Sequence, residues 1–530
     1  MLPMEAKVAQ VRDLQDGEMR EVVVGETKVL LVRLKGKFYA IGGECTHYGG
    51  PLAEGALSGH RVTCPWHQAV FEVMNGDLEE PPALDAEPCY TVRVEGDDVI
   101  VKVPEPAEGR RTPAMVRRDP ADDRTLVILG AGAAGNAAAE TLRQDGFRGR
   151  VVMITQESRL PYDRPNLSKG YLSGDAGPEA LPWRTPEFYR DHDIEVMMGQ
   201  RVARVEVPFK TLTFADGSSL TYDSLLLATG GAPRGLEIPG SQWPNVFTLR
   251  SADNADAIIA AALPASRVVV IGAGFIGMEA AAALTKRGLA ATVVSHGPVP
   301  LGRQLGPEIG RMLQEAQAEK GVAFRLGRTP VRLEGDGRVQ AVVLDDGEAL
   351  PADLVVVGLG IKPATEMLRG VSLNADGSVS TDRRLKAAEG LYAAGDVARF
   401  PDWRDGSSIR IEHWRLAEQQ GRIAAHNMAG REVEFAGIPF FWSEQFDLFL
   451  QYAGHAESWD ELIVHGDLAR RNFLAFYVKD NRVMAAAGLQ RDRQLAAMAA
   501  LMRLDQTPGP EELRRNPEFD PGARLKSLQA

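Results

Sequence analysis

The sequence predicts a multidomain protein. A small antiparallel β domain precedes an α/β region with two dinucleotide-binding units, and a C-terminal α+β domain follows. Three observations predict this fold class. The chain has 530 residues, too many for one hydrophobic core. Residues 1–104 contain short β-type runs separated by Gly and Asp turns, without an amphipathic helix of useful length. A strand, a Gly-x-Gly-x-x-Gly turn and a helix occur twice further along the chain.

Composition narrows the classes of partner. The 44% hydrophobic and 25% charged residues are typical of an ordinary soluble protein. A net charge of −12 disfavours nucleic acid and anionic membranes as partners. No apolar run approaches the length of a membrane span, and residues 1–5 lack the features of a signal peptide. With only three cysteines, we predict a protein of the reducing cytoplasm.

Within residues 1–104, strands are expected around 21–24, 29–32 and 99–103, with functional loops at one end of the domain. Two short fingers, Cys45-x-His47 and Cys64-x-x-His67, each combine a thiol with an imidazole. This mixed order fits a Rieske [2Fe–2S] cluster, in which one iron takes both thiolates and the other both imidazoles. A structural zinc site is the alternative, although zinc fingers normally group two Cys and then two His.

The segments 47–52 and 64–67 resemble the Rieske ferredoxin family. Gly49 and Trp66 stand where the Rieske proteins of bc complexes carry an extra disulfide, so the resemblance is to the low-potential ferredoxin branch. Gln68 replaces the Gly that many Rieske sequences have at this place. Cys89 lies outside the fingers and is expected to be a buried small hydrophobe.

Residues 105–123 are rich in Pro and charged residues and are predicted to form a semi-rigid linker. Its length would set how far the first domain can travel.

The first dinucleotide-binding unit begins with a strand at 125–129 and the turn Gly130-x-Gly132-x-x-Gly135. The glycines allow a pyrophosphate to approach the backbone at the positive end of a helix. Glu157, after the next strand, is placed to accept a hydrogen bond from a ribose hydroxyl.

A second copy starts with a strand at 268–271 and the turn Gly272-x-Gly274-x-x-Gly277. The later segments 216–230 and 346–358 also match each other, so a whole nucleotide-binding domain is duplicated.

Four further segments resemble the two-dinucleotide flavoproteins with a glutathione-reductase-like fold, and in particular ferredoxin reductases of aromatic dioxygenases and apoptosis-inducing-factor-like flavoproteins. They are residues 162–169, 228–234, 391–397 and 412–414. The resemblance implies FAD in a discontinuous domain, 124–240 and 365–435, and a nicotinamide nucleotide in the inserted domain 241–364. Residues 436–530, which include the segment 440–447, resemble the C-terminal domain of the same reductases.

The resemblance also implies roles for individual residues. Residues expected to bind FAD are Gly130, Gly132, Gly135, Glu157, Gly395 and Asp396, with Arg164 and Lys169 beside the flavin. Residues expected to contact the nicotinamide nucleotide are Gly272, Gly274, Gly277 and Glu279. Catalytic roles are expected for Lys169, Glu279 and Trp414; Trp414 could equally be a plain core residue.

The choice between NADH and NADPH is left open. NADH-specific members of the family place a Glu after the strand at 291–294, whereas this chain has Ser295-His296. Loss of the acid removes the repulsion of a 2′-phosphate, and His296 with Arg303 could attract one. The family as a whole favours NADH.

The motifs together predict an NAD(P)H-dependent oxidoreductase. Flavin can accept two electrons from a nicotinamide and release them singly to an iron–sulfur cluster. No cysteine follows Cys89, so a dithiol route is closed. The expected order is nicotinamide, FAD, Rieske cluster and an external acceptor such as an oxygenase. Alternatives are a slow redox sensor, or a reductase of a quinone, oxygen or nitrite. A homodimer would allow transfer between chains.

Overall fold

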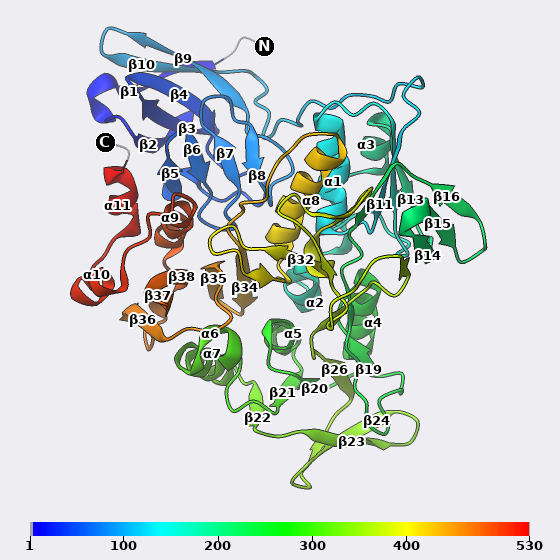
Figure 1. Cartoon of the computed structure of the whole chain (residues 1–530). Coiled ribbons are helices and arrows are strands. Elements are labelled where there is room, and N and C mark those ends of the chain that lie inside the picture. Colours follow the sequence, from blue (N-terminus) through cyan, green and yellow to red (C-terminus); the bar gives the residue numbers. More distant parts are fainter. Residues whose placement is uncertain (1–3, 529–530) are drawn as a thin grey trace. The chain divides into compact units, whose positions relative to one another are not determined.

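The computed structural model describes residues 4–528, which form two compact units. The first unit combines the N-terminal residues up to Met115 with Ala436–Trp442 and the chain from Leu450 onward. The second unit contains Val116–Phe435 and Ser443–Phe449. The two ends of the sequence therefore share one unit, in which the blue and the orange-to-red segments of Figure 1 belong together.

The N-terminal domain is built from two antiparallel sheets. The first has the order β1-β10-β9-β4-β3-β2 and the second β5-β6-β7-β8. One hydrophobic cluster includes Val29, Leu31 and Val101, and a second includes Leu30, Cys45 and Cys64. The predicted small antiparallel β domain is confirmed. Its strands are β1 (Met4–Gln10), β2 (Glu18–Val24), β3 (Thr27–Leu34), β4 (Lys37–Gly42), β5 (Ala56–Ser58), β6 (Arg61–Thr63), β7 (Val70–Glu72), β8 (Leu78–Glu80), β9 (Cys89–Glu95) and β10 (Asp98–Val103).

The first nucleotide-binding sheet has the order β13-β12-β11-β17-β31-β30, and its strands β13, β12, β11, β17 and β31 run parallel. Hydrophobic clusters cover both faces, as expected for a parallel sheet. Helices α1 (Ala133–Gln144) and α8 (Trp414–Met428) pack closely together beside it. The strands are β11 (Thr125–Leu129), β12 (Arg150–Ile154), β13 (Ile194–Met197), β17 (Ser224–Leu227), β30 (Lys386–Ala388) and β31 (Leu391–Ala393).

The second nucleotide-binding sheet is parallel, with the order β19-β26-β20-β21-β22. The chain enters it after β17 and later returns to the first sheet at β30 and β31. The strands are β19 (Val246–Thr248), β20 (Arg267–Ile271), β21 (Ala290–Ser295), β22 (Ala323–Leu326) and β26 (Leu354–Val357); the helices are α4 (Ala252–Ala262), α5 (Phe275–Lys286), α6 (Gly302–Leu305) and α7 (Pro307–Glu319).

The predicted duplication is visible in the smaller sheets. An antiparallel β14-β15-β16 ribbon lies between β13 and β17 of the first parallel sheet, and β23-β24-β25 lies between β22 and β26 of the second. Strands β18 and β27 pair where the chain crosses to and from the inserted sheet. The bounds are β14 (Val202–Glu206), β15 (Thr211–Phe214), β16 (Ser219–Thr221), β18 (Gly231–Pro233), β23 (Pro330–Gly335), β24 (Val339–Leu344), β25 (Ala349–Pro351), β27 (Ile361–Pro363), β28 (Leu368–Arg369), β29 (Val379–Ser380), β32 (Ala398–Pro401), β33 (Ser408–Ile409), α2 (Gly170–Ser173) and α3 (Pro186–Asp191).

The C-terminal segment forms a five-stranded sheet, β34-β35-β38-β37-β36, followed by three helices. Within the first unit, the last helix and the helix after β38 pack against β5 of the N-terminal domain. Arg503 contributes an ion pair to Glu80 at 2.6 Å. The elements are β34 (Phe440–Gln445), β35 (Leu448–Gly454), β36 (Glu461–Asp467), β37 (Asn472–Lys479), β38 (Arg482–Leu489), α9 (Asp492–Arg503), α10 (Pro510–Arg515) and α11 (Pro521–Ser527).

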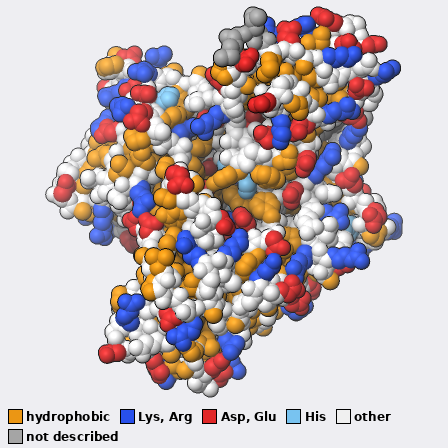
Figure 2. All heavy atoms as spheres, turned by 180° about the vertical axis from the view of Figure 1, so that it is seen from behind, with side chains coloured by type: hydrophobic (Ala, Val, Ile, Leu, Met, Phe, Trp, Pro, Cys, Tyr) orange, Lys and Arg blue, Asp and Glu red, His pale blue; other side chains and the backbone are white. Residues whose placement is uncertain are grey.

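Among residues 4–528, no helix has the length and apolar character needed to cross a membrane. On the face drawn in Figure 2, acidic and basic side chains are interspersed.

Candidate functional site

The four predicted ligands meet at the ends of two loops in the N-terminal domain. Cys45 and His47 follow β4, and Cys64 and His67 lie between β6 and β7. Each finger is closed by its own backbone: the Cys45 N–H donates to the Gly50 carbonyl, and Cys64 N–H donates to Ala69, both at 2.8 Å. Because these bonds fix the turns, the side chains of the two fingers can converge.

The donor atoms fit a Rieske cluster. The two Nδ1 atoms of His47 and His67 face each other at 3.2 Å. Cys45 and Cys64 are free and buried; the hydrogen bond between their thiols raises the pKa of Cys45 and lowers that of Cys64. Burial lowers the pKa of His47 to about 3, so its ring is neutral at physiological pH, as a metal ligand requires.

Residues outside the fingers hold the first loop. Thr46, between the two ligands, donates its N–H to Glu87 Oε1 at 2.9 Å and its hydroxyl to the Asp85 carbonyl at 2.7 Å. Burial raises the pKa of Glu87 to about 9, so this carboxyl is protonated at neutral pH. The contact is between residues 41 positions apart, and local sequence patterns gave no signal for it.

Two expectations about this domain are settled by the backbone. Gln68 is buried with φ of +59°, a conformation that favours Gly, so the backbone is compatible with the Gly that the resemblance led us to expect here. Cys89 was expected to be a buried hydrophobe, and this is wrong: its side chain is exposed. Cys89 opens β9, where Tyr90 is the buried residue, so the alternation of the strand turns Cys89 outward.

A residue of the C-terminal domain lies on the imidazole ligands. The ring of Trp442 lies with its centroid 4.5 Å from that of His67 and 6.5 Å from that of His47. Gln451, fully buried on β35, donates its Nε2 to the Pro65 carbonyl in the second finger at 2.9 Å. Trp442 falls in the segment 440–447 that marked the C-terminal domain, but its role was not predicted.

The first glycine-rich turn has the shape needed for a dinucleotide. Gly130 has φ of +114°, and a Cβ there would overlap the Ala228 carbonyl. A Cβ on Gly135 would overlap the Gly130 carbonyl, so α1 could not pack against the turn. Gly132 faces open space, where a pyrophosphate could approach. The second turn repeats this arrangement at Gly272, Gly277 and Gly274.

Glu157 and Arg164 form one cluster in the second unit. Glu157 accepts from Arg164 Nη2 at 2.7 Å and from the Tyr162 hydroxyl at 2.6 Å. Arg164 is also bonded to the Arg250 carbonyl. Burial raises the pKa of Glu157, but the Arg164 cation and the hydrogen bonds from Tyr162 and Arg164 outweigh it and lower the pKa, so Glu157 is ionised and available as an acceptor. Arg164 and Lys169 were both expected beside the flavin. In the structure, Arg164 is paired with Glu157, the residue expected to bind a ribose hydroxyl.

The predicted ribityl contact lies in a short 3₁₀ turn after β31. Asp396 is paired with Arg250 Nη2 at 2.7 Å. The preceding Gly395 donates its N–H to Gln420 Oε1 at 2.8 Å. Gln420 is fully buried, and its Nε2 has no partner among residues 4–528. An orphaned donor beside Asp396 fits a polar cofactor chain.

Lys169 and Glu279 come from different nucleotide domains and meet in a buried cluster. Lys169 Nζ lies 2.8 Å from Glu279 Oε2, which also accepts from the Ser168 hydroxyl. The other oxygen of Glu279 accepts from the Ser443 hydroxyl at 2.8 Å. The structure therefore joins the two predicted catalytic residues and adds Ser443, which the sequence did not indicate.

Trp414 lies elsewhere. It begins α8, as predicted, with His413 at the N-cap. Its ring packs against Trp183 at 5.1 Å, beside the hydrophobic cluster around α1 and α8. A core role is thus directly supported, and a catalytic role stays a prediction. Ser295 ends β21, and the following His296 is exposed.

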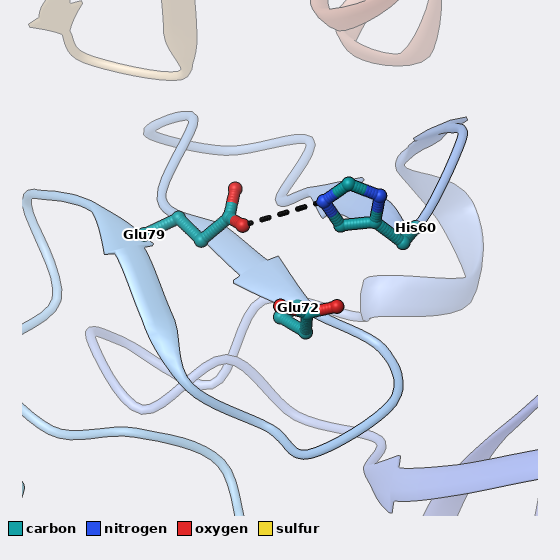
Figure 3. Close-up of side chains that lie close together, drawn as sticks. All are labelled: His60, Glu72 and Glu79. Atoms are coloured by element: carbon teal, nitrogen blue, oxygen red, sulfur yellow. Dashed lines mark ion pairs between the residues drawn. The ribbon is translucent and has the colours of Figure 1, made fainter.

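A separate group, His60, Glu72 and Glu79, was not indicated by sequence spacing. Its potential ligand atoms lie within 4.8 Å of one another (Figure 3). His60 faces Glu79 at 3.6 Å, and Arg61 forms an ion pair with the same carboxylate. Because Arg61 already supplies positive charge, the group is an ion-pair cluster.

Comparisons with known families agree with these sites. Residues 4–94 match the Rieske [2Fe-2S] domain, 124–421 the pyridine nucleotide-disulphide oxidoreductases, and 440–529 the reductase C-terminal domain. The Rieske match supports the [2Fe–2S] cluster over the zinc alternative. FAD, a nicotinamide nucleotide and a [2Fe–2S] cluster are therefore the cofactors of these domains.

Similar proteins cover most of the chain. Apoptosis-inducing factor 3 of Homo sapiens is 40% identical over 511 residues, which are 94% of this chain and 84% of that protein. The ferredoxin–NAD(+) reductase subunit of a Pseudomonas putida benzene 1,2-dioxygenase system is 33% identical, covering 73% of this chain and 94% of its own.

Solved structures give the same result. A ferredoxin reductase from Rhodopseudomonas palustris matches with a TM-score of 0.72 at 33% identity, covering 77% of this chain and all of that one. The covalent putidaredoxin reductase–putidaredoxin complex matches with a TM-score of 0.72 at 30% identity, with 77% and 99% of the two chains covered. The chain is therefore an NAD(P)H-dependent oxidoreductase of the ferredoxin-reductase type and belongs to the pyridine nucleotide-disulphide oxidoreductases, with a Rieske domain at its N-terminal end and a reductase C-terminal domain after it.

Proposed function

We propose that the protein passes electrons from NADH or NADPH through FAD to its own Rieske cluster, and from there to an external acceptor such as an oxygenase. The observation that carries this proposal is the contact of Trp442 with both imidazole ligands. In one chain, a residue of the reductase C-terminal domain thus lies against the ligands of the Rieske domain. Such a contact is expected if the reductase part of the chain supplies electrons to the cluster.

The peptide bond between Trp442 and Ser443 connects two sites. Trp442 contacts the imidazole ligands, whereas Ser443 donates to Glu279, which is paired with Lys169. Lys169 lies in the segment expected along the flavin, where a cation would stabilise the anionic reduced ring. Glu279, on α5, holds that cation in place.

The names of the relatives support an external acceptor. One relative is the ferredoxin–NAD(+) reductase subunit of a benzene 1,2-dioxygenase system, and one solved structure is a covalent complex of putidaredoxin reductase with putidaredoxin. Here the iron–sulfur domain is part of the same chain.

The test is anaerobic stopped-flow mixing with NADH and with NADPH, following flavin bleaching and the EPR signal of the reduced cluster. We expect the flavin to bleach first and the cluster signal to follow at the rate at which the flavin absorbance recovers. Flavin reduction without any cluster signal would disprove the relay. His67→Cys should lower the cluster potential while flavin reduction continues; unchanged reduction of an external acceptor would remove the cluster from the route.

A slow redox sensor is the second candidate, favoured by the 40% identity with apoptosis-inducing factor 3 over 94% of the chain. It predicts a long-lived charge-transfer absorbance after mixing with NADH, and a change of oligomeric state on reduction. The same stopped-flow traces, with size-exclusion chromatography of the reduced protein, separate the two candidates.

A further inference from the structure

A cavity of about 200 Å³ lies inside the first unit, between the N-terminal domain and the C-terminal helices. One wall is formed by the start of β2 and by β5, and the other by α9 and α11, which pack against β5 (Figure 1). Among the described residues that line it, none is a cluster ligand or a residue expected to bind FAD or the nicotinamide nucleotide. The proposed electron relay therefore gives this cavity no role.

The buried part of the lining is apolar. Both walls contribute to it, and each of its residues is at most 5% exposed: Leu14 and Ala56 from the N-terminal domain, and Ala497 and Leu525 from α9 and α11. A cavity of about 150 Å³ with such a lining takes up benzene. The space is therefore large enough for a benzene-sized ring that carries one small substituent.

The charged part of the lining is predominantly basic. It consists of Glu18, Arg20, Arg493 and Lys526. Lys526 and Glu18 neutralise each other in an ion pair of 2.8 Å, and Arg20 donates to the uncharged Asp13 carbonyl. The side chain of Arg493 is exposed and forms neither a hydrogen bond nor an ion pair within residues 4–528. The cavity thus has a cation without a partner beside an apolar lining.

We propose that this cavity binds a small organic monocarboxylate of about the size of benzoate, with its carboxylate on the Arg493 guanidinium and its apolar body on Ala497 and Leu525. A guanidinium is planar and can donate two parallel hydrogen bonds to a carboxylate. The apolar body gains free energy by leaving water for the buried lining. An inorganic anion would leave that lining bare, and an uncharged ring would leave the cation unpaired.

A ligand in this cavity would contact both walls and so connect the N-terminal domain to α9 and α11. Because the cavity exists in the folded protein and not in the unfolded chain, the ligand should also raise Tm. The inference goes beyond the proposed function and does not rest on it, since neither NADH nor an electron acceptor takes part in the binding.

The experiment is a calorimetric titration of the full-length holoprotein with benzoate. Benzyl alcohol, which has the ring without the charge, and inorganic phosphate, which has the charge without the ring, are the comparison ligands. Arg493→Gln removes the cation at an exposed position, and Ala497→Leu fills part of the cavity from α9. Arg338→Gln is the matched control, because Arg338 is an exposed residue of the other unit whose side chain has no partner within residues 4–528.

We expect one benzoate to bind per chain and to raise Tm, with a Kd at least ten-fold weaker for Arg493→Gln and for Ala497→Leu and unaltered for Arg338→Gln. Benzyl alcohol and phosphate should each bind at least ten-fold more weakly than benzoate. The flavin absorbance is recorded during the titration and should not change, because the cavity is separate from the FAD turn.

Three outcomes would each overturn the proposal: no heat of binding and no rise in Tm with benzoate, an unaltered Kd in Arg493→Gln, or binding that perturbs the flavin absorbance. If Ala497→Leu does not fold, the comparison of Arg493→Gln with Arg338→Gln decides alone.

Discussion

At the scale of single residues, the position of the cluster ligands depends on polar groups that bind the loops carrying them. Hydrogen bonds hold Thr46 at both its N–H and its hydroxyl. Because Thr46 lies between Cys45 and His47, these bonds also fix the backbone of the two ligands. Metal ligands generally depend on such outer contacts for their orientation. Glu87 is the partner that can be altered without touching a ligand.

Glu87→Ala is expected to weaken cluster retention, because the Thr46 N–H loses its acceptor at a cost of about 1–3 kcal/mol. Glu87→Gln keeps an oxygen in the same place and should retain the cluster, since the native carboxyl is already neutral at pH 7. The iron-to-protein ratio after incubation at 37 °C checks this. Equal iron loss from both variants would contradict the hydrogen-bond argument.

A second residue-scale prediction concerns Glu418 on α8. It is almost completely buried, neither carboxylate oxygen has a partner among residues 4–528, and burial raises its pKa well above the usual range. The folded protein therefore keeps a proton that the unfolded chain releases above about pH 4.5. The free energy of unfolding consequently falls as the pH rises past that value.

Glu418→Gln replaces the titratable carboxyl by a neutral amide, so folding no longer requires uptake of a proton. The variant should therefore be more stable at pH 8, and each kcal/mol gained should raise Tm by about 2–4 °C. At pH 4.5 the difference should be much smaller. Thermal unfolding of both proteins across this pH range is the measurement. Parallel pH profiles would show that Glu418 does not titrate with folding.

At the scale of elements, the sequence predicted those parts that depend on local patterns. The strands at 125–129 and 268–271, both glycine turns and the start of α8 at Trp414 lie where they were expected. The two metal fingers were predictable because ligand chemistry restricts both residue type and spacing. Contacts between distant segments were not predictable, such as Glu279 with Ser443, 164 positions apart, because no local pattern encodes them. The predicted domain boundaries stay predictions.

The two glycine positions of the first turn make an element-scale prediction. Gly135→Ala places a Cβ against the Gly130 carbonyl, so α1 must shift, at a cost of about 1–3 kcal/mol. Gly132→Val projects into open space, so the fold should be kept while the pyrophosphate of FAD is obstructed. Tm in the apo form and FAD content are measured together. A lower apo Tm with Gly132→Val would show that this residue packs against protein instead.

We expect the residue at the end of β21 to influence the preference between NADH and NADPH. Ser295→Glu should lower kcat/KM for NADPH at least ten-fold relative to NADH, because the new carboxylate would repel the 2′-phosphate and accept from ribose hydroxyls. Steady-state reduction of ferricyanide with each nucleotide is sufficient. Ser295→Gln, without the charge, is the control and should change the ratio far less.

At the scale of the whole molecule, the N- and C-terminal ends of the chain form one unit, while the nucleotide-binding sheets form the other. The cluster ligands therefore belong to the same unit as the C-terminal sheet and not to that of the FAD turn. Trp442 and Gln451 make this association specific, because both contact the loops of the ligands.

Gln451→Leu tests whether that association matters for electron supply. The Pro65 carbonyl would lose a buried donor that comes from 386 positions away, at a cost of about 1–3 kcal/mol. Weaker attachment of the second finger to the C-terminal domain should slow reduction of the cluster about ten-fold. Reduction of the flavin by NADH should stay unchanged, because Gln451 lies outside the nucleotide-binding unit. Lys526→Met is the matched control, since its exposed ion pair with Glu18 joins the same two segments but contributes at most about 1 kcal/mol. Anaerobic stopped flow resolves both phases; equal rates in all three proteins would show that the seating of the Rieske domain does not limit electron supply.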